Sequence, residues 1–182
     1  MSRSELVDVL RGYRLAVVAT VAADGQPQAA VVGIAISDGL EIVFDTVVGS
    51  RKVQNLQRDP RVGVVIGWDR EVTVQIDGVA DIPSGDELER IRACYFVAYP
   101  DGRDRLSWPG ITHVRVRPLW LRLSDFNSDP PRIVELRGRE LEYESWSSRG
   151  RHVTAFAFGT CDMNMKGTSL ATLPSVGRGG AG

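Results

Sequence analysis

Four consecutive residues, Gly49-Ser50-Arg51-Lys52, carry the clearest chemical signal in this sequence. They follow an apolar, β-branched run at Leu40–Thr46 that predicts a strand, and Arg51–Arg58 has the pattern of a short helix. Ser50 would cap that helix, and the two cations in its first turn would oppose the helix dipole. A bound anion removes this conflict, because free backbone N–H groups, a hydroxyl and two cations can contact one phosphate. The segment predicts a phosphate site, and the alternative is an ordinary cap with two solvated basic side chains.

Few other residues offer a reactive group in a known pattern. The histidines, His113 and His152, lie in no catalytic or metal-binding motif, and we expect both to be structural or surface residues. Cys94 and Cys161 are far apart and match no redox or metal spacing. We therefore expect no metal site, and the sequence identifies no catalytic residue.

The bulk composition is that of one globular domain and excludes several functional classes. The 182 residues are 43% hydrophobic and 25% charged, and the formal net charge of −1 gives no electrostatic support for binding nucleic acid or an anionic membrane. No apolar run approaches the roughly 20 residues that cross a bilayer. The stretch Met1–Tyr13 has an amphipathic helix pattern and does not resemble a signal peptide. We expect a cytoplasmic protein that binds neither nucleic acid nor membrane.

Alternating apolar residues and tight turns predict a mainly β chain. Hairpin signals at Asp24-Gly25, Asp38-Gly39 and Asp69-Arg70 separate the expected strands. These strands are Leu15–Ala23, Gln28–Ser37, Leu40–Thr46, Arg61–Trp68, Glu71–Ile82 and Ile111–Phe126. The first three would form a meander, and Pro118 predicts an edge position or a bulge in the last.

Helices are few in this pattern. Besides Arg51–Arg58, we expect a helix at Ser4–Arg11 and a longer one from Ser84, where Glu87 would complete a capping box, to Ala98. Arg103–Gly110 has the composition of a loop. Six strands joined by tight turns, with few helices, predict a small antiparallel β-barrel with Greek-key-like connections.

The segment Phe44–Lys52, followed by Asp59-Pro60-Arg61-Val62 and Trp68, resembles the pyridoxamine 5′-phosphate oxidase family. In that family an aromatic-x-Thr pattern ends a strand, Gly-Ser-Arg-Lys follows, and Asn/Asp-Pro-Arg-Val begins the next strand. The resemblance runs from about Leu15 to Phe126 and implies the FMN-binding split-barrel fold. It also implies a homodimer that holds FMN in a cleft between two barrels, where the flavin carries the electrons and acts on a small-molecule substrate.

The resemblance assigns FMN contacts residue by residue. Arg51 and Lys52 match the phosphate-binding pair, Ser50 lies beside the same phosphate, and Thr46 matches a strand-end threonine next to the cofactor. Three further groups are implied: a strand that lines the flavin ring, two polar residues that face the flavin from the partner chain, and a late tryptophan and arginine that close the site. In this sequence they are Ala30, Val31 and Val32; Thr73 and Gln75; and Trp120 and Arg132.

Departures from the vitamin B6 oxidases concern the substrate. Asp45 stands where those enzymes have an aromatic residue, Ala29–Ser37 lacks their arginine and lysine, and no Arg-Leu-His segment is found near the end. The cationic contacts that a phosphorylated B6 substrate needs are therefore missing. The resemblance implies an FMN-binding oxidoreductase that acts on an unidentified small molecule.

Three alternatives stay open. Related members bind a deazaflavin (coenzyme F-420) in the same groove; its phosphate would also suit Arg51 and Lys52, and small residues near Gly33 and Ala35 leave space for its longer tail. A non-enzymatic flavin- or haem-binding protein on the same barrel is the second, with His113 as the plausible haem ligand within the barrel. A dimeric binding module with an empty groove is the third.

One FMN-binding split-barrel domain over residues 1–137 accounts for these elements. From residue 138 to residue 182 the sequence shifts to Ser, Gly, Thr and Arg, has no clear periodicity and does not resemble the family. We predict that 138–182 is an atypical, loosely packed segment that is disordered after about Leu173.

Overall fold

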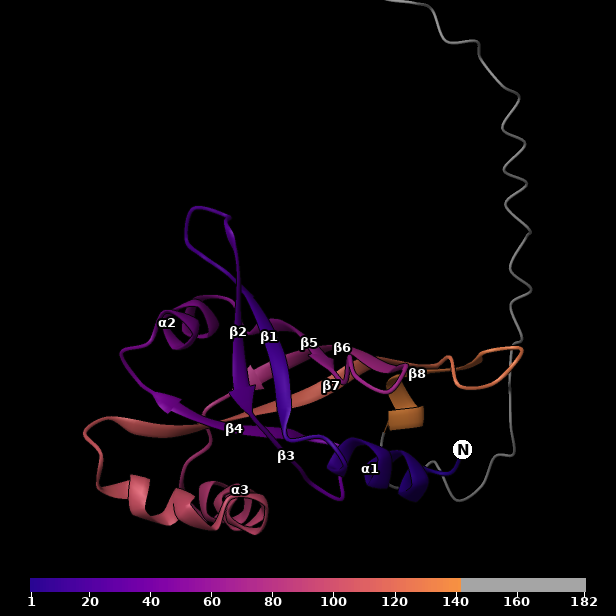
Figure 1. The fold of residues 1–182 in the computed structure, drawn as a ribbon. Helices are drawn as coiled ribbons and strands as arrows, with labels where there is room; N and C mark the ends of the chain where they lie inside the picture. The colour runs from indigo at the N-terminus through magenta and orange to yellow at the C-terminus, as the bar shows by residue number, and fades with distance from the viewer. Residues whose placement is uncertain (142–182) are drawn as a thin grey trace, which may run out of the picture.

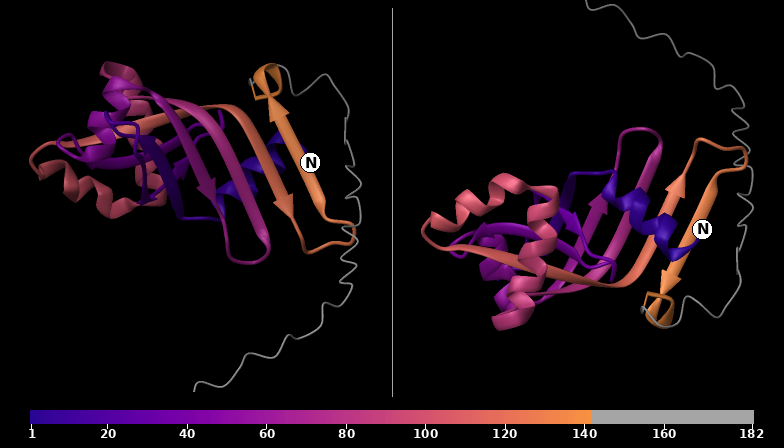
Figure 2. Two further views of the ribbon diagram at one scale, coloured as in Figure 1. Left: turned by 90° about the horizontal axis from the view of Figure 1, so that it is seen from above. Right: turned by 90° about the horizontal axis from the view of Figure 1, so that it is seen from below.

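The computed structural model describes residues 1–141, so the predictions made for 142–182 lie outside the described residues. One antiparallel sheet, curved into a half-barrel, dominates the structure (Figure 1). Two helices lie on one side of this sheet, as the view from below shows (Figure 2), and a third lies at one end on the other side. The mainly β fold is therefore confirmed.

The described residues form eight strands. They are Leu15–Val21 (β1), Pro27–Gly33 (β2), Ala35–Ile36 (β3), Ile42–Val47 (β4), Arg61–Ile66 (β5), Val72–Asp81 (β6), Ile111–Asp125 (β7) and Arg132–Arg137 (β8). The sheet order is β2-β1-β5-β6-β7-β4-β3, and β8 pairs with β7. All six predicted strands are present. The strand expected at Gln28–Ser37 is divided into β2 and β3, and β8 was not predicted.

The long strand β7 organises the sheet. It pairs with β6 on one edge; on the other edge it pairs with β4 through residues 111–116 and with β8 through residues 120–125. Pro118 lies at this changeover, where the β6–β7 register shifts at Asp77/Gly78, so the bulge predicted there is confirmed. The predicted meander is only partly right, because β4 pairs with β3 over just two residue pairs and runs mainly along β7.

The helical elements are α1 (Arg3–Arg11), α2 (Arg51–Arg58), α3 (Gly85–Ala98) and the 3₁₀ helices η1 (Pro100–Ser107) and η2 (Gly138–Leu141). Helix α1 begins at a capping box that the sequence reading missed, in which Ser2 Oγ accepts from the Glu5 N–H at 3.2 Å. The capping box predicted at Ser84 is not formed, because Glu87 binds Arg90 and Arg115 instead. Most of the loop expected at 103–110 is η1.

Two apolar clusters hold these elements together. The larger fills the barrel and takes in residues of α1 and α2, such as Leu6, Leu10 and Val53. The smaller lies between α3 and the sheet around Ile91, Tyr95 and Phe96, as the helical periodicity predicted. None of the helices within residues 1–141 is long and apolar enough to cross a bilayer.

Candidate functional site

The turn between β4 and α2 forms a polar cradle at one end of the barrel, defined here by Thr46, Ser50, Lys52 and the first turn of α2. The Ser50 N–H donates to the Val47 carbonyl at 2.9 Å, which closes the turn that leads into α2. Ser50 has the extended backbone of an N-cap residue, as predicted, but its side chain makes no capping hydrogen bond. A Cβ built at Gly49 meets no atom within 4 Å, so this side of the cradle is open.

Three predicted side chains converge in the cradle. Thr46 Oγ1 lies 3.2 Å from Ser50 Oγ, and Lys52 Nζ donates to Thr46 Oγ1 at 3.2 Å. Thr112 is the β7 partner of Thr46, so both side chains lie on one face of the sheet, and each is only 9% exposed. Thr112 is a site residue that the sequence reading missed, because nothing in the sequence shows that β4 pairs with β7.

The start of α2 holds donors without acceptors. No described residue accepts a hydrogen bond from the N–H groups of Arg51, Lys52 or Val53. Within residues 1–141, neither basic side chain forms an ion pair. Free N–H groups at a helix N-terminus and nearby cations both favour a bound anion. Backbone donors, hydroxyls and an ammonium group in one turn fit a phosphate.

Arg51 lies beside β2, outside the cluster of hydroxyls. The amide group of Gln28 stands between Arg51 and Asn55: in one amide orientation it accepts from Asn55 Nδ2 at 3.0 Å, and in the other from Arg51 Nε at 3.2 Å. Asn55 is 6% exposed and also donates to Thr20 Oγ1 at 3.0 Å. This polar chain ties α2 to β1 and β2 and positions Arg51. It was not predicted, although Asn55, four residues after Arg51, lies on the same helix face.

The predicted residues of β2 alternate between its two faces. Val32 is buried, Ala30 is half-buried, and both share the face on which Gln28 meets α2. Val31 points to the opposite face and is 60% exposed. The structure places Gln28 of this strand beside α2 and divides the predicted residues between the two faces, and their contact with the flavin stays a prediction.

The predicted residues of β6 lie far from the cradle in the same chain. In the β6–β7 register Gln75 stands opposite Arg122, ten residues along β7 from Thr112, and a strand rises about 3.3 Å per residue. Gln75 is exposed and pairs with Val65 of β5, and Thr73 pairs with Ser124 of β7. A single chain does not bring these two side chains to Lys52.

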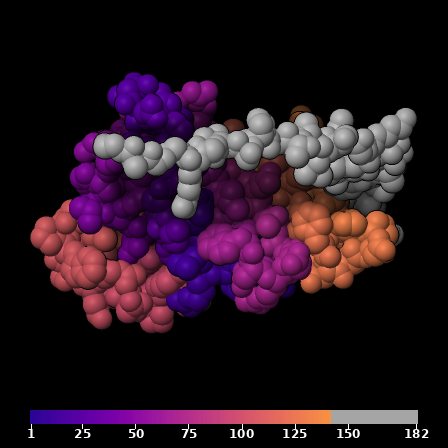
Figure 3. Space-filling model, turned by 45° about the horizontal axis from the view of Figure 1, so that its top comes forward, coloured from indigo at the N-terminus to yellow at the C-terminus, as the bar shows by residue number. Residues whose placement is uncertain are grey.

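Trp120 and Arg132 are also remote from the cradle. Trp120 Nε1 donates to Glu135 of β8 at 2.8 Å, and Arg132 begins β8 opposite Asp125. In Figure 3 the orange residues of the β7–β8 turn lie at the opposite end of the molecule from the β1–β2 hairpin, which adjoins α2. Their assignment to the site stays a prediction that needs a second chain.

One face of strands β2, β1 and β5 is apolar and exposed. The register aligns Val31, Val17 and Val65 in one row, and Gln75 continues that row onto β6. Val31 is 60% exposed and Val65 is 37% exposed. Exposed apolar surface of this kind is a feature of interaction sites.

His113, on which the haem alternative depended, is buried beneath α3. It is 1% exposed, and its ring stands edge-on to Tyr95 and Phe96 with centroids 5.2 Å and 5.8 Å away. Neither ring nitrogen has a hydrogen-bond partner among the described residues. Burial, with a smaller contribution from Arg92, lowers the pKa of His113, so the ring is neutral. The structure therefore places His113 in the packing between α3 and the sheet.

Comparisons with known proteins bear on the family and the fold of this chain. The family described as pyridoxamine 5′-phosphate oxidase matches residues 2–119. A pyridoxine/pyridoxamine 5′-phosphate oxidase from Bordetella avium is 32% identical over 141 residues, which cover 72% of this chain; the chain spans only 65% of that relative's length.

Two solved structures share the fold. One is a haem-binding protein from Mycobacterium smegmatis, with a TM-score of 0.65 at 21% identity over 78% of this chain and 60% of that one. The other is a pyridoxamine 5′-phosphate oxidase-related, FMN-binding protein from Nostoc punctiforme, with a TM-score of 0.53 at 14% identity over 72% and 84% of the two chains. This chain belongs to the pyridoxamine 5′-phosphate oxidase family and has its split-barrel fold.

Proposed function

We propose that this protein is an FMN-binding oxidoreductase that acts on a small molecule and holds the FMN phosphate at the start of α2. The observation that carries the proposal is the convergence of Lys52, Thr46 and Ser50 on a helix start whose N–H groups have no acceptor within residues 1–141. The chain belongs to a family that includes an FMN-binding protein of the same fold.

Each part of the cradle has a distinct role in this proposal. The Lys52 ammonium and the N–H groups of α2 balance the phosphate charge, and the hydroxyls of Thr46 and Ser50 orient its oxygens. Arg51, supported by Gln28, supplies the second cation. Each charge-assisted contact contributes about 1.5–3 kcal/mol to binding. The flavin, when bound, supplies the electron transfer, and these residues bind and orient it.

We propose further that the site is completed by a second copy of the chain. The apolar face around Val31, Val17 and Val65 would be covered by the partner, because protein–protein interfaces bury exposed apolar surface. Because Gln75 lies in the same row of side chains as Val65, it would also lie in this interface. Such a homodimer would allow the partner's copies of the β6 and β7–β8 residues to reach the cofactor, which they cannot do within one chain.

The substrate of this proposal is not a phosphorylated B6 vitamer. Asp45, at the position that departs from the B6 oxidases, accepts from Tyr95 Oη at 2.7 Å and from Arg105 Nε at 2.8 Å. The Asp45 carboxylate fastens α3 and η1 to the sheet. As an anion, it provides no cationic contact for a second phosphate. The curated relative is a B6 oxidase, but the chain spans 65% of its length, so its activity does not transfer as a whole.

The deazaflavin is the alternative that the cradle itself supports, because it also presents a phosphate. Haem is less well supported, since His113 is buried against Tyr95 and Phe96 and does not face the cradle. The three cofactors differ in their spectra, so one experiment separates them.

The test is to titrate the purified full chain, stripped of cofactor, with FMN, deazaflavin and haemin in parallel. We expect saturable quenching of FMN fluorescence at one FMN per chain, with the mass of a dimer by light scattering. A clear preference for deazaflavin would replace FMN in the proposal. Binding of haemin alone, or of none of the three, would contradict the proposed function.

A further inference from the structure

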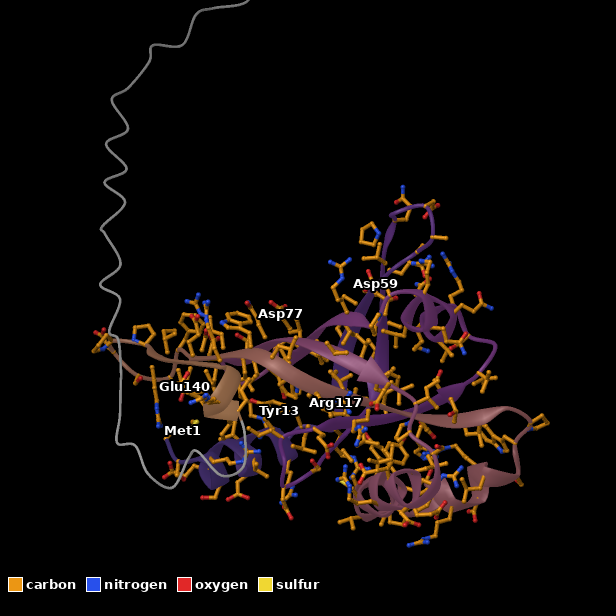
Figure 4. All side chains as sticks on the ribbon, turned by 180° about the vertical axis from the view of Figure 1, so that it is seen from behind. Met1, Tyr13, Asp59, Asp77, Arg117 and Glu140 are labelled. Carbon is orange, nitrogen blue, oxygen red and sulfur yellow. The ribbon has the colours of Figure 1, made fainter. Side chains whose placement is uncertain are left out.

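A groove of about 1200 Å³ lies away from the cradle, on the side of the sheet that carries α1 and α3. Its walls come from α1, α3, β3, the bulge of β7 and η2. Figure 4 shows two of its lining residues, Tyr13 and Arg117, between α1 and α3. No residue of the cradle lines the groove, so its function does not depend on the function proposed above.

Part of the lining of the groove is aliphatic. It consists of Ile34, Ile36, Val97, Leu119 and Leu141. Two of these side chains are strongly exposed, Val97 at 85% and Leu119 at 57%, although α3 and β7 have buried positions for apolar residues elsewhere. Leu119 follows Pro118 at the β7 bulge, where it is left out of the ladder with β6. Exposed aliphatic side chains that line one cavity favour an apolar ligand.

The rim of the groove is cationic. Five arginines line it, with three carboxylates; the arginines are Arg3, Arg11, Arg14, Arg90 and Arg117. Arg11 pairs with Asp38 at 2.6 Å, and Arg90 pairs with Glu41 at 2.8 Å. Arg14 instead donates to the Ala98 carbonyl at 2.6 Å and lies over the Tyr99 ring, and it forms no ion pair with a carboxylate of the described chain.

We propose that this groove binds an amphipathic carboxylate with an aliphatic tail, of the fatty-acid class. The tail would lie along the aliphatic lining, which includes Val97 and Leu119, and the carboxylate would accept from the remaining guanidinium donors of Arg14 and Arg11. Arg14 follows α1 and donates to the carbonyl of Ala98 at the end of α3, so it connects two walls of the groove. An arginine fork suits the planar geometry of a carboxylate.

The lining favours this ligand over haem, although both are amphipathic carboxylates. Haem needs an axial ligand, and Cys94 and Tyr13 are the lining residues that could supply an anionic one. Burial raises the pKa of the Cys94 thiol and also the pKa of the Tyr13 phenol, so both stay protonated at neutral pH. His113 is not among the residues that line the groove.

The experiment is calorimetric titration of the full chain with dodecanoate below its micelle concentration. We expect one dodecanoate per chain. Dodecyltrimethylammonium, which has the same tail and the opposite charge, should bind at least tenfold more weakly. Val97→Glu places a negative charge on the aliphatic lining at an exposed position and should weaken dodecanoate binding at least tenfold. Arg14→Gln should weaken it about tenfold. Phe126→Glu, an exposed apolar position outside the groove, is the matched control and should bind as the parent does.

Four outcomes would overturn the proposal. The first is dodecanoate binding that Val97→Glu leaves unchanged while circular dichroism shows a native fold. The second is equal binding of the cationic and anionic amphiphiles. The third is haemin binding that Val97→Glu abolishes, in a chain that takes up no dodecanoate. The fourth is a loss of mass by light scattering in Val97→Glu, because the groove would then be a contact between chains.

Discussion

Two regions of this protein are rich in basic side chains, and they use them in opposite ways. Between α3 and the sheet, Arg90, Arg105 and Arg115 each bind carboxylates of the same chain. At the start of α2, Arg51 and Lys52 form no ion pair within residues 1–141. The sequence singles out Arg51 and Lys52 by their place at a helix start, but it does not show which carboxylates the fold brings to Arg90, Arg105 and Arg115. The difference shows which cations hold the fold and which are left for a ligand.

In the α3 region, Arg105 and Arg115 are paired with carboxylates of the same chain. Arg115 is 8% exposed, and its guanidinium binds Asp81 at 2.9 Å and 2.6 Å and Glu87 at 2.5 Å. Arg105 binds Asp45, which also accepts from Tyr95. Burial, together with the hydrogen bond to Asp45, raises the pKa of Tyr95, so the phenol stays protonated as the donor. These contacts fasten α3 and η1 to the sheet and leave no free charge for a ligand.

Replacing Arg115 by Ala should have the largest effect on stability. The substitution leaves Asp81 without its main cation and removes a 3.4 Å contact to Glu41, and breaking such a network costs about 3 kcal/mol of unfolding free energy. Urea unfolding would measure the loss, and FMN affinity should stay within twofold of the parent. Arg117→Ala, which removes a half-exposed cation from the same Asp81, is the control and should cost less than about 1 kcal/mol. Equal effects of the two variants would show that burial is not what makes Arg115 important.

Asn55→Ala should have a smaller effect that appears in both stability and binding. It removes the buried amide between Thr20 and Gln28, and a lost buried hydrogen bond costs about 1–3 kcal/mol. Because Gln28 then loses its support beside Arg51, we expect FMN affinity to fall several-fold while Lys52 still anchors the phosphate. Gln57→Ala, at an exposed position of the same helix, should change neither quantity. Unchanged FMN affinity in Asn55→Ala would remove the positioning role of this chain of contacts.

His113 should give the smallest effect, seen as a pH dependence of stability. Burial holds its folded pKa below the value of 6.5 that it has when unfolded, so the unfolded chain binds more protons in that window. The contribution is complete above about pH 6.5 and is lost as the pH falls toward the folded pKa. Urea unfolding from pH 8 to pH 5 should therefore show a steeper loss for the parent than for His113→Leu. Parallel curves would show that His113 is protonated at no cost in the folded chain.

The strands could be predicted because each depends on local information. Alternating apolar and polar residues, together with the turns at Asp24-Gly25 and Asp38-Gly39, are sufficient to predict them. Strand β8 was missed because its six residues, of mixed charge, follow a Pro-rich turn and gain their partner only from β7. The capping box expected at Ser84 failed because Glu87 meets Arg115, which lies 28 residues further along the chain.

The candidate site, too, could be predicted only where it depends on residues close together in the sequence. Thr46, Ser50 and Lys52 lie within seven residues and meet as expected. Thr112, Gln28 and Asn55 reach the site only through strand pairing and helix packing, which the sequence does not specify. Lys52 has no carboxylate partner within residues 1–141, whereas Arg115 has several. This difference likewise depends on which carboxylates the fold brings near each cation.

The measurement that tests the account most directly is a comparison of FMN affinity and unfolding free energy in the double variant Arg51→Ala with Lys52→Ala. Removing two charge-assisted contacts should weaken FMN binding by about 3–6 kcal/mol, at least a hundredfold. The unfolding free energy should stay within about 0.5 kcal/mol of the parent, because neither side chain is buried. Arg58→Ala, in the last turn of the same helix, is the control and should leave FMN affinity unchanged. A double variant that binds FMN like the parent, or that loses stability instead of affinity, would contradict the account.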